Sequence, residues 1–249
     1  MTRLFRFSAA AVVALLTSAG TADADTFRVG VEDLRYYPHY NYENGAWTGF
    51  GRDLLDAFAA DAGHTFVYEA MPVKRLFQAL VDKTVDFKYP DNAYWSADMK
   101  DGKGVTYSAP VVRYIDGVVV LPAKVGGGAD GIATLGTVRG FTPFAWLARV
   151  QEGKTQLAEN SDYDALLQQA MKGRVDGAYA NVAVARWRLR EVLKQPDALV
   201  FDPALPHADD FYHLSTTTRP EVVAQFDAWM AANPSKVEAL KVKYGLTGG

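Results

Sequence analysis

The stretch TFVYEAMPVKRLFQALVDKTVDFKY, residues 65–89, is predicted to fold as a strand, a helix and a second strand. The middle part is predicted to be helical because Val73, Leu76, Phe77 and Leu80 recur at the spacing of one helical face. The short runs on either side are rich in the β-branched and aromatic residues typical of strands. A strand, a helix and a strand in succession indicate parallel strands joined by a crossover helix, the unit of an α/β fold.

The same alternation extends over most of the chain. A strand at 26–33 and a helix at 49–63 precede this stretch, and a second series of strands and helices covers 135–202. We therefore predict an α/β protein of two units, each with a mainly parallel sheet flanked by helices. LVDKTVDFKY (80–89) and AMKGRVDGAY (170–179) both run from a helix end into Val-Asp and a strand, which indicates two units built alike. Common α/β sequence patterns would also give so short a match.

The first 24 residues predict a cleaved signal peptide and therefore a periplasmic location. Arg3 and Arg6 precede an apolar run over 7–19, and Ala-Asp-Ala at 22–24 matches the Ala-x-Ala cleavage pattern. The alternative, a membrane anchor, requires roughly 20 continuous apolar residues, and this run is shorter and contains serine and threonine. The expected mature chain begins at residue 25.

Composition narrows the possible classes of function. The 249 residues include no cysteine, which excludes disulfides and thiolate metal sites. A net charge of −3 without any basic run argues against nucleic-acid binding. The four histidines show no metal-ligand spacing, and Gly126, Gly128 and Gly131 precede a strand where a dinucleotide site needs a helix. We expect no metal, no cofactor and no nucleic-acid partner.

Aromatic residues cluster after two of the predicted strands. Tyr36, Tyr37 and Trp47 follow the first strand, and Tyr89 and Trp95 follow the strand that ends the stretch quoted above. Ligands of open parallel sheets bind outside the carboxyl ends of the strands, so both loops are expected to face one cleft. The alternative that these side chains only cover a hydrophobic edge remains open, since tyrosine is common in half-buried positions.

The predicted helix over 142–153 begins with Thr142 as its N-cap and Pro143 in its first turn. Such a helix start offers free backbone N–H groups to a carboxylate, a phosphate or a carbonyl oxygen. Every α/β unit contains such a start, so this feature alone identifies no ligand.

Four segments carry a more specific pattern: YYPHYNYENGAWTGFGRDLLDAF (36–58), LVDKTVDF (80–87), YSAPVV (107–112) and AMKGRVDGAYANVAVA (170–185). In this order they resemble the extracytoplasmic solute-binding proteins of family 3, which deliver polar amino acids to ABC importers. The resemblance implies the type II periplasmic-binding fold, in which two α/β lobes joined by a two-strand hinge enclose a ligand. The implied partners are a small-molecule ligand and an inner-membrane ABC permease, and the expected state is a monomer.

The resemblance also implies how the chain divides between the lobes. Lobe 1 is expected to comprise residues 25–118 and 207–249, and lobe 2 residues 119–206. The C-terminal segment would then return to the first unit.

The segment WSADMKDGKGVTYS, residues 95–108, departs from the family pattern. Amino-acid binders of the family hold the ligand's α-carboxylate with an arginine shortly before the Phe-Ser-x-Pro signature, whereas this segment offers Lys100 and Lys103. They hold the α-amino group with an acid at the position that matches Asn181. Lysine lacks the bidentate fork of arginine, and an amide cannot balance an ammonium charge. The predicted ligand is therefore a small polar or aromatic-bearing solute other than a standard α-amino acid.

The expected ligand-binding residues come from the aromatic loops and from the positions that match the family's site. They are Asp33, Tyr36, Tyr37, Trp47, Lys88, Tyr89, Asp91, Asn92, Trp95, Ser108, Arg139, Phe141, Thr142 and Asn181. For Lys88, the alternative of pairing with a nearby carboxylate remains open.

Two other functions remain open beside the binding protein, which would need no catalytic residue. One is a periplasmic accessory or sensor protein with the same fold and no role in transport. The other is an enzyme similar to cyclohexadienyl dehydratases, for which Glu32, Asp33 or Asp91 would supply the acid in the cleft.

Overall fold

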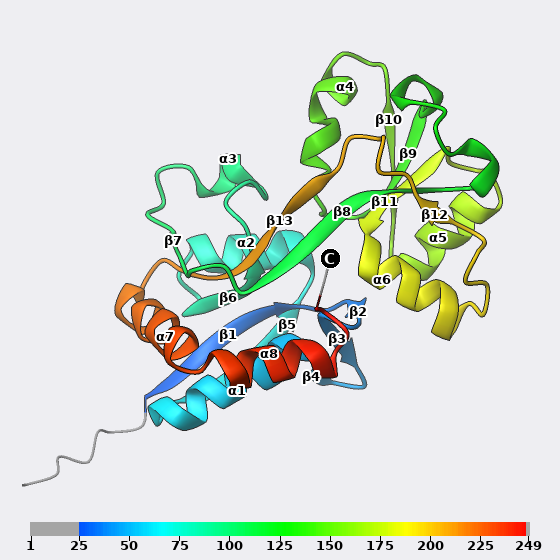
Figure 1. The fold of residues 1–249 in the computed structure, drawn as a ribbon. Helices are drawn as coiled ribbons and strands as arrows, with labels where there is room; N and C mark the ends of the chain where they lie inside the picture. Colours follow the sequence, from blue (N-terminus) through cyan, green and yellow to red (C-terminus); the bar gives the residue numbers. More distant parts are fainter. Residues whose placement is uncertain (1–24, 248–249) are drawn as a thin grey trace, which may run out of the picture.

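The computed structural model describes residues 25–247, so the predicted signal peptide lies outside the described residues. Eight strands follow one another across a single sheet in the order β10-β9-β11-β8-β13-β6-β1-β5. Two short strands extend it, since β12 pairs with β8 and β7 pairs with β13. Helices pack against both ends of this sheet (Figure 1). The α/β fold class predicted from the sequence is confirmed.

The first half of the sheet is built from the stretch that opened the sequence analysis and from the strand before it. Its elements are β1 (Thr26–Glu32), α1 (Phe50–Ala62), β5 (Thr65–Met71), α2 (Val73–Val81) and β6 (Phe87–Asp91). β1 pairs in parallel with both β5 and β6. α1 ends at Gly63, whose φ of 75° is a left-handed conformation that glycine adopts easily. The buried face of α2 includes Leu76, Phe77 and Leu80, as the spacing predicts.

The second half repeats the alternation of strand and helix. Its main elements are β9 (Thr134–Val138), α4 (Leu147–Gln151), β10 (Gln156–Asn160), α5 (Tyr163–Met171), β11 (Gly177–Asn181) and α6 (Val182–Trp187). β9 pairs in parallel with β10 and β11. α5 starts where the Asp162 carboxylate accepts a hydrogen bond from the backbone N–H of Ala165 at 2.9 Å, a normal N-cap.

Shorter elements complete the chain. They are α3 (Ala97–Lys100), β7 (Thr106–Tyr107), the 3₁₀ turns Pro122–Lys124 and Ala129–Gly131, the π-helical turn Arg188–Val192 after α6, and β12 (Val200–Phe201).

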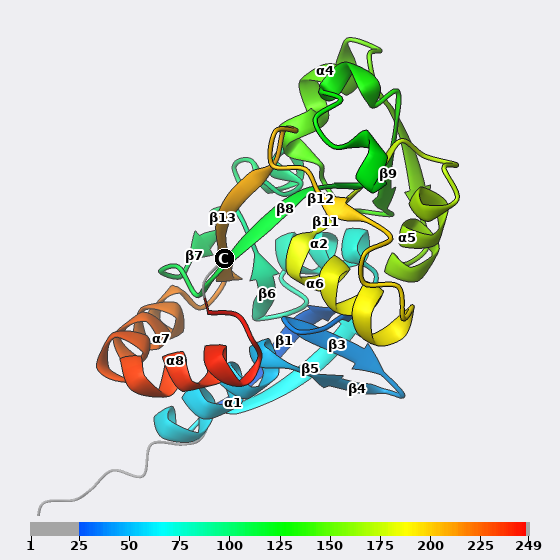
Figure 2. The ribbon, with the colours of Figure 1, turned by 45° about the vertical axis from the view of Figure 1, so that its right-hand side comes forward.

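Two long strands cross from one half of the molecule to the other. β8 (Val112–Val120) and β13 (Ala208–Thr216) pair antiparallel, and β8 continues into a pairing with β11 while β13 continues into a pairing with β6. Figures 1 and 2 show both strands between the two halves. We propose the lobe boundaries expected above, because both fall in or beside these strands, and use "lobe 1" and "lobe 2" for those ranges.

The C-terminal helices α7 (Pro220–Ala232) and α8 (Pro234–Lys243) pack on lobe 1 (Figure 2). The Trp229 indole N–H donates to Asp61 in α1 at 2.8 Å, and the Tyr244 hydroxyl donates to Asp53 in the same helix, also at 2.8 Å.

A small antiparallel sheet follows β1 and carries the first aromatic cluster. It consists of β2 (Arg35–Tyr36), β3 (Tyr40–Glu43) and β4 (Ala46–Thr48). Asn44 and Gly45 connect β3 to β4 with positive φ angles of 52° and 79°, as a two-residue hairpin turn requires.

The helix predicted over 142–153 begins later than expected. A 3₁₀ turn covers Phe144–Trp146, and α4 follows with no side-chain cap. The prediction of Thr142 as an N-cap is therefore wrong, because its hydroxyl instead accepts a hydrogen bond from the backbone N–H of Ser96 at 3.4 Å. Trp146 is fully buried and its indole donates to the Pro206 carbonyl at 2.8 Å, which fixes this segment in the tighter turn.

Within residues 25–247, no helix is both long and apolar enough to cross a membrane. In the same part of the chain, no group of three or more histidines and acids is arranged to hold a metal ion.

Candidate ligand-binding cleft

A small cavity lies where the two lobes meet. Its lining comes from both lobes and is mostly aromatic: Glu32, Tyr36, Tyr40, Val73, Phe77, Pro90, Trp95, Asp116, Gly140, Phe141, Thr142, Tyr179 and Tyr212. The cavity volume is about 20 Å³, which is room for about one water molecule. A ligand larger than water must therefore displace some of these side chains.

Tyrosine rings form one wall of this cavity. Tyr36 stacks on Tyr40 with a centroid distance of 4.7 Å, and Tyr212 stacks on Tyr114 at 4.5 Å. The hydroxyl groups of Tyr36 and Tyr212 lie 3.2 Å apart and share a hydrogen bond. Trp95 completes the wall against Tyr212, with ring centroids 5.6 Å apart.

Direct contacts hold the lobes together around the cavity. Tyr36 of lobe 1 meets the edge of Tyr163 of lobe 2 with a centroid distance of 5.2 Å. Tyr94 stacks on Phe144 across the interface at 5.7 Å. Gly140 has a φ of 93°, and a Cβ added there would lie only 3.0 Å from the Cβ of Val73. A glycine at this position therefore permits the close approach of lobe 2 to α2.

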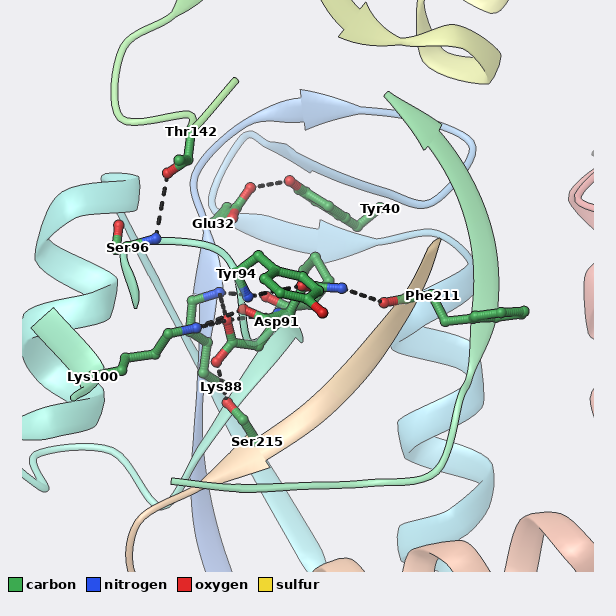
Figure 3. A network of polar contacts seen from close by, with 12 residues as sticks. Glu32, Tyr40, Lys88, Asp91, Tyr94, Ser96, Lys100, Thr142, Phe211 and Ser215 are labelled. Carbon is green, nitrogen blue, oxygen red and sulfur yellow. Dashed lines mark hydrogen bonds and ion pairs between the residues drawn. The ribbon is translucent and has the colours of Figure 1, made fainter. Parts of the chain in front are cut away.

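Two buried acids face the cavity, one from each of the strands β1 and β8. Glu32 accepts a hydrogen bond from the Tyr40 hydroxyl, and burial raises the pKa of its carboxyl group (Figure 3). Asp116 accepts one from the side-chain N–H of Asn181 at 3.2 Å, and burial raises its pKa to about 7. Among residues 25–247, no lysine, arginine or histidine lines the cavity.

Asn181 does not line the cavity but contacts two residues that do, Asp116 and Tyr212. Its amide oxygen accepts from the backbone N–H of Val184 at 3.1 Å and so caps α6, while its amide nitrogen also lies 3.3 Å from the Tyr212 hydroxyl. His39 is buried beside Tyr212 at a centroid distance of 4.9 Å. Burial lowers the pKa of His39 to about 3, so its imidazole is neutral at physiological pH.

The polar residues at the end of β6 form a buried cluster inside lobe 1. Lys88 is completely buried, donates to the Pro90 carbonyl and lies 3.4 Å from Asp91. Lys100 donates to the same Asp91 oxygen at 3.2 Å, and the Ser215 hydroxyl donates to the other at 2.7 Å (Figure 3). The alternative interpretation of Lys88, pairing with a nearby carboxylate, matches this arrangement.

Asn92 is also bonded within lobe 1. Its amide nitrogen donates to Asp210 at 2.9 Å and to the Phe211 carbonyl at 3.1 Å, and its amide oxygen accepts from the backbone N–H of Tyr94. These bonds position the short segment that carries Trp95 to the cavity.

The other predicted site residues lie at several distances from the cavity. Tyr36, Trp95, Phe141 and Thr142 line it. Trp47 and Tyr89 are buried in the core of lobe 1. The Ser108 hydroxyl donates to the carbonyl of Ala109, and the Tyr37 ring lies against Trp187, 4.7 Å between centroids. Asp33 is partly exposed, and Arg139 is exposed and pairs with Glu159 at 3.6 Å.

Several lining residues were not among the predicted ligand contacts: Glu32, which the sequence offered only as a possible enzyme acid, Tyr40, Phe77, Asp116, Tyr179 and Tyr212. The sequence does contain a pattern that indicates a buried position for Asp116. It follows Val112 and Tyr114 at even spacing in an apolar strand, so its side chain shares their buried face.

No protein-family model matches the sequence, and no curated protein matches it. Solved structures do resemble the fold. An arginine transport-system periplasmic binding protein from Legionella pneumophila has a TM-score of 0.70 at 16% identity, over 89% of this chain and 100% of its own. The arginine-, lysine-, histidine-binding protein ArtJ from Geobacillus stearothermophilus has a TM-score of 0.67 at 21% identity, over 88% of this chain and 95% of its own.

A sensor domain gives a comparable match. The sensor domain of a histidine kinase, described as similar to periplasmic binding proteins, has a TM-score of 0.70 at 20% identity, over 89% of this chain and 96% of its own. At these identities the likeness concerns the fold. The two-lobed periplasmic-binding fold implied by the sequence resemblance is therefore confirmed.

Proposed function

We propose that this chain is the periplasmic solute-binding protein of an ABC-type importer and captures a small solute between its two lobes. The cavity at the lobe interface carries the proposal, because its lining comes from both lobes and a ligand there would join them. Closure then requires only that the ligand bind the closed arrangement more tightly than an open one. Structural neighbours that bind arginine or take part in its transport support the same class.

We assign the ligand contacts to the ring faces of Tyr36, Trp95 and Phe141 and to the hydroxyl of Thr142, all of which line the cavity. Asn181 is a positioning residue, since it acts through its bond to Asp116. The set contains no arginine, which supports a solute other than a standard α-amino acid. The proposal includes no chemical step, and the bound compound should be recovered unchanged after prolonged incubation.

A sensor protein is the second candidate function. The match to a histidine kinase sensor domain favours it, because that domain has the same TM-score as the best arginine-transport neighbour named above. Both candidates use the same cleft, so they differ only in what the closed protein contacts.

The cleft can be tested with Trp95→Ala, which removes a large ring from its wall. The mature protein is purified without refolding, the compound released on denaturation is identified by mass spectrometry, and its affinity is measured by calorimetry. We expect Trp95→Ala to weaken binding by about tenfold or more, as for a buried aromatic contact. Phe211→Ala is the matched control, since this aromatic residue is exposed and does not line the cavity. Equal affinities in both variants would remove the cleft from the proposal.

Transport and sensing can be separated in cells. Deleting the gene should abolish uptake of the identified compound if the protein serves an importer. Normal uptake together with an altered transcriptional response to the compound would instead support the sensor.

A further inference from the structure

The buried charges around the cleft do not balance. Five lysine and carboxylate side chains are buried there: Glu32, Lys88, Asp91, Lys100 and Asp116. Two lysines face three carboxylates, so one negative charge has no counterpart when all are ionised. A buried charge without a partner is costly, and the site can relieve that cost by taking up a proton or a cation.

The surplus lies on the cavity side. Both lysines bond to Asp91, and the Lys88 ammonium lies 4.3 Å from the ring centroid of Phe77, a lining residue. Glu32 and Asp116 have neutral hydrogen-bond donors, the Tyr40 hydroxyl and the Asn181 amide. Within residues 25–247, the two carboxylates that border the cavity therefore have no direct ion pair.

A second observation also points to a bound ligand. The Tyr179 side chain lines the cavity and is 2% exposed, and its hydroxyl has no hydrogen-bond partner within residues 25–247. Buried polar atoms are normally satisfied, so this hydroxyl is available to donate or accept a hydrogen bond.

The remaining lining suits a positive charge. Tyr36 and Tyr212 supply π systems, whose negative faces attract cations most strongly where water is excluded. The rings of Phe77 and Trp95 already face the Lys88 ammonium, at 4.3 and 5.6 Å from their centroids. A carboxylate in the ligand would instead meet Glu32 and Asp116. Arg139 is not placed to bind a ligand carboxylate in the cavity, because its side chain is 67% exposed and pairs with Glu159.

We propose that the captured solute is a small organic cation without a carboxylate, such as a protonated amine or a quaternary ammonium, held between Glu32, Asp116 and the surrounding rings. This inference rests on the proposed function. It explains why the cleft lacks the arginine of amino-acid binders.

Matched pairs of probes test the charge of the ligand. Choline is compared with its uncharged isostere, in which a tert-butyl group replaces the trimethylammonium, and phenethylamine is compared with phenylacetate. Calorimetry on the mature protein should show binding of at least one cation, with its partner about tenfold weaker or more. Asp116→Asn and Glu32→Gln should each weaken the cation by about tenfold or more. Asp130→Asn, which changes a fully exposed acid, should leave it unchanged.

Each outcome tests the positive charge of the ligand, solute binding itself, or both. Equal or tighter binding of the uncharged or anionic probe, or unchanged cation affinity in both acid variants, overturns the cation. If an acid or zwitterion is bound and Trp95→Ala abolishes its binding, the cation fails while solute binding stands. If no probe binds, the compound released on denaturation is the test: a cation supports the proposal, and a neutral or anionic compound overturns it. An empty protein that binds no probe overturns both.

Discussion

The buried lysines and carboxylates near the cleft form two groups. In lobe 1, Asp91 bonds to two lysines and to Ser215, so its charge is matched within the protein (Figure 3). At the lobe interface, Glu32 and Asp116 receive hydrogen bonds only from neutral groups. The two groups are equally buried, yet only the first is complete without a ligand. Burial of charge alone therefore does not identify a binding site, and the absence of a protein partner is the informative feature.

The largest expected effect tests the complete group. Asp91→Asn removes the carboxylate between Lys88 and Lys100 and leaves both ammonium groups buried without it. Breaking a buried ion pair in this way should lower the free energy of unfolding by about 3–5 kcal/mol. Urea denaturation at neutral pH measures the change.

Asp98→Asn is the control for this variant, since Asp98 is an exposed acid in the adjacent helix α3. Its effect should stay within about 0.5 kcal/mol. If the two variants unfold at the same urea concentration, the Asp91 cluster is not the complete structural group described above.

Neutralising a cleft acid should stabilise the protein, in contrast to neutralising Asp91. Burial raises the pKa of Asp116 from 3.8 to about 7, so between these pH values the folded protein holds a proton that the unfolded chain has released. Stability therefore falls as pH rises through this window, and the cost is fully present above pH 7. Asp116→Asn removes the charge and should raise the free energy of unfolding by about 2–4 kcal/mol at alkaline pH.

The comparison of Asp116→Asn with the natural protein is made by thermal denaturation across pH. The gain should shrink as pH falls and vanish near the pKa of the unfolded carboxyl group. The raised pKa of Glu32 adds to the fall and the pKa of His39, lowered to about 3, opposes it, but both groups are present in the two proteins and their contributions cancel in the difference. A loss of stability at alkaline pH would mean that Asp116 has a counter-charge in the protein, like Asp91.

The sequence predicts the fold better than the site for a physical reason. Leu76, Phe77 and Leu80 specify one face of α2 by spacing alone, and Gly63 marks the end of α1, so local patterns suffice. The site depends on pairings between distant segments. β6 lies between β1 and β13 and is buried on both faces, so strand alternation cannot assign Lys88 to the cleft or to the core.

The aromatic residues also show that sequence patterns do not decide which side chains reach the cavity. Tyr36 and Trp95 were predicted at the cleft because they follow strands, and both line the cavity. Trp47 and Tyr89 were predicted there as well, but Trp47 lies in β4 and Tyr89 lies within β6, and both pack into the core of lobe 1. Tyr212 approaches from β13, a strand distant in sequence, and could be placed only once its pairing with β8 was known.

The smallest expected effect concerns exposed charges at the rim of the cleft. Glu159 of lobe 2 lies 3.9 Å from Lys74 of lobe 1 and 3.6 Å from Arg139 of its own lobe. Exposed pairs of this kind contribute about 0–1 kcal/mol and are screened by salt. Glu159→Gln should therefore weaken binding of the cleft ligand by less than about fivefold at low salt, and the difference should disappear at high salt.

Glu152→Gln is the matched control, because Glu152 pairs with Lys154 within lobe 2 and touches no residue of lobe 1 through that pair. Its affinity should equal that of the natural protein at every salt concentration. A loss in Glu159→Gln as large as that in Asp116→Asn would mean that charges at the rim hold the lobes together. In that case the unpaired acids inside the cleft would not be the feature that separates the binding site from the buried cluster around Asp91.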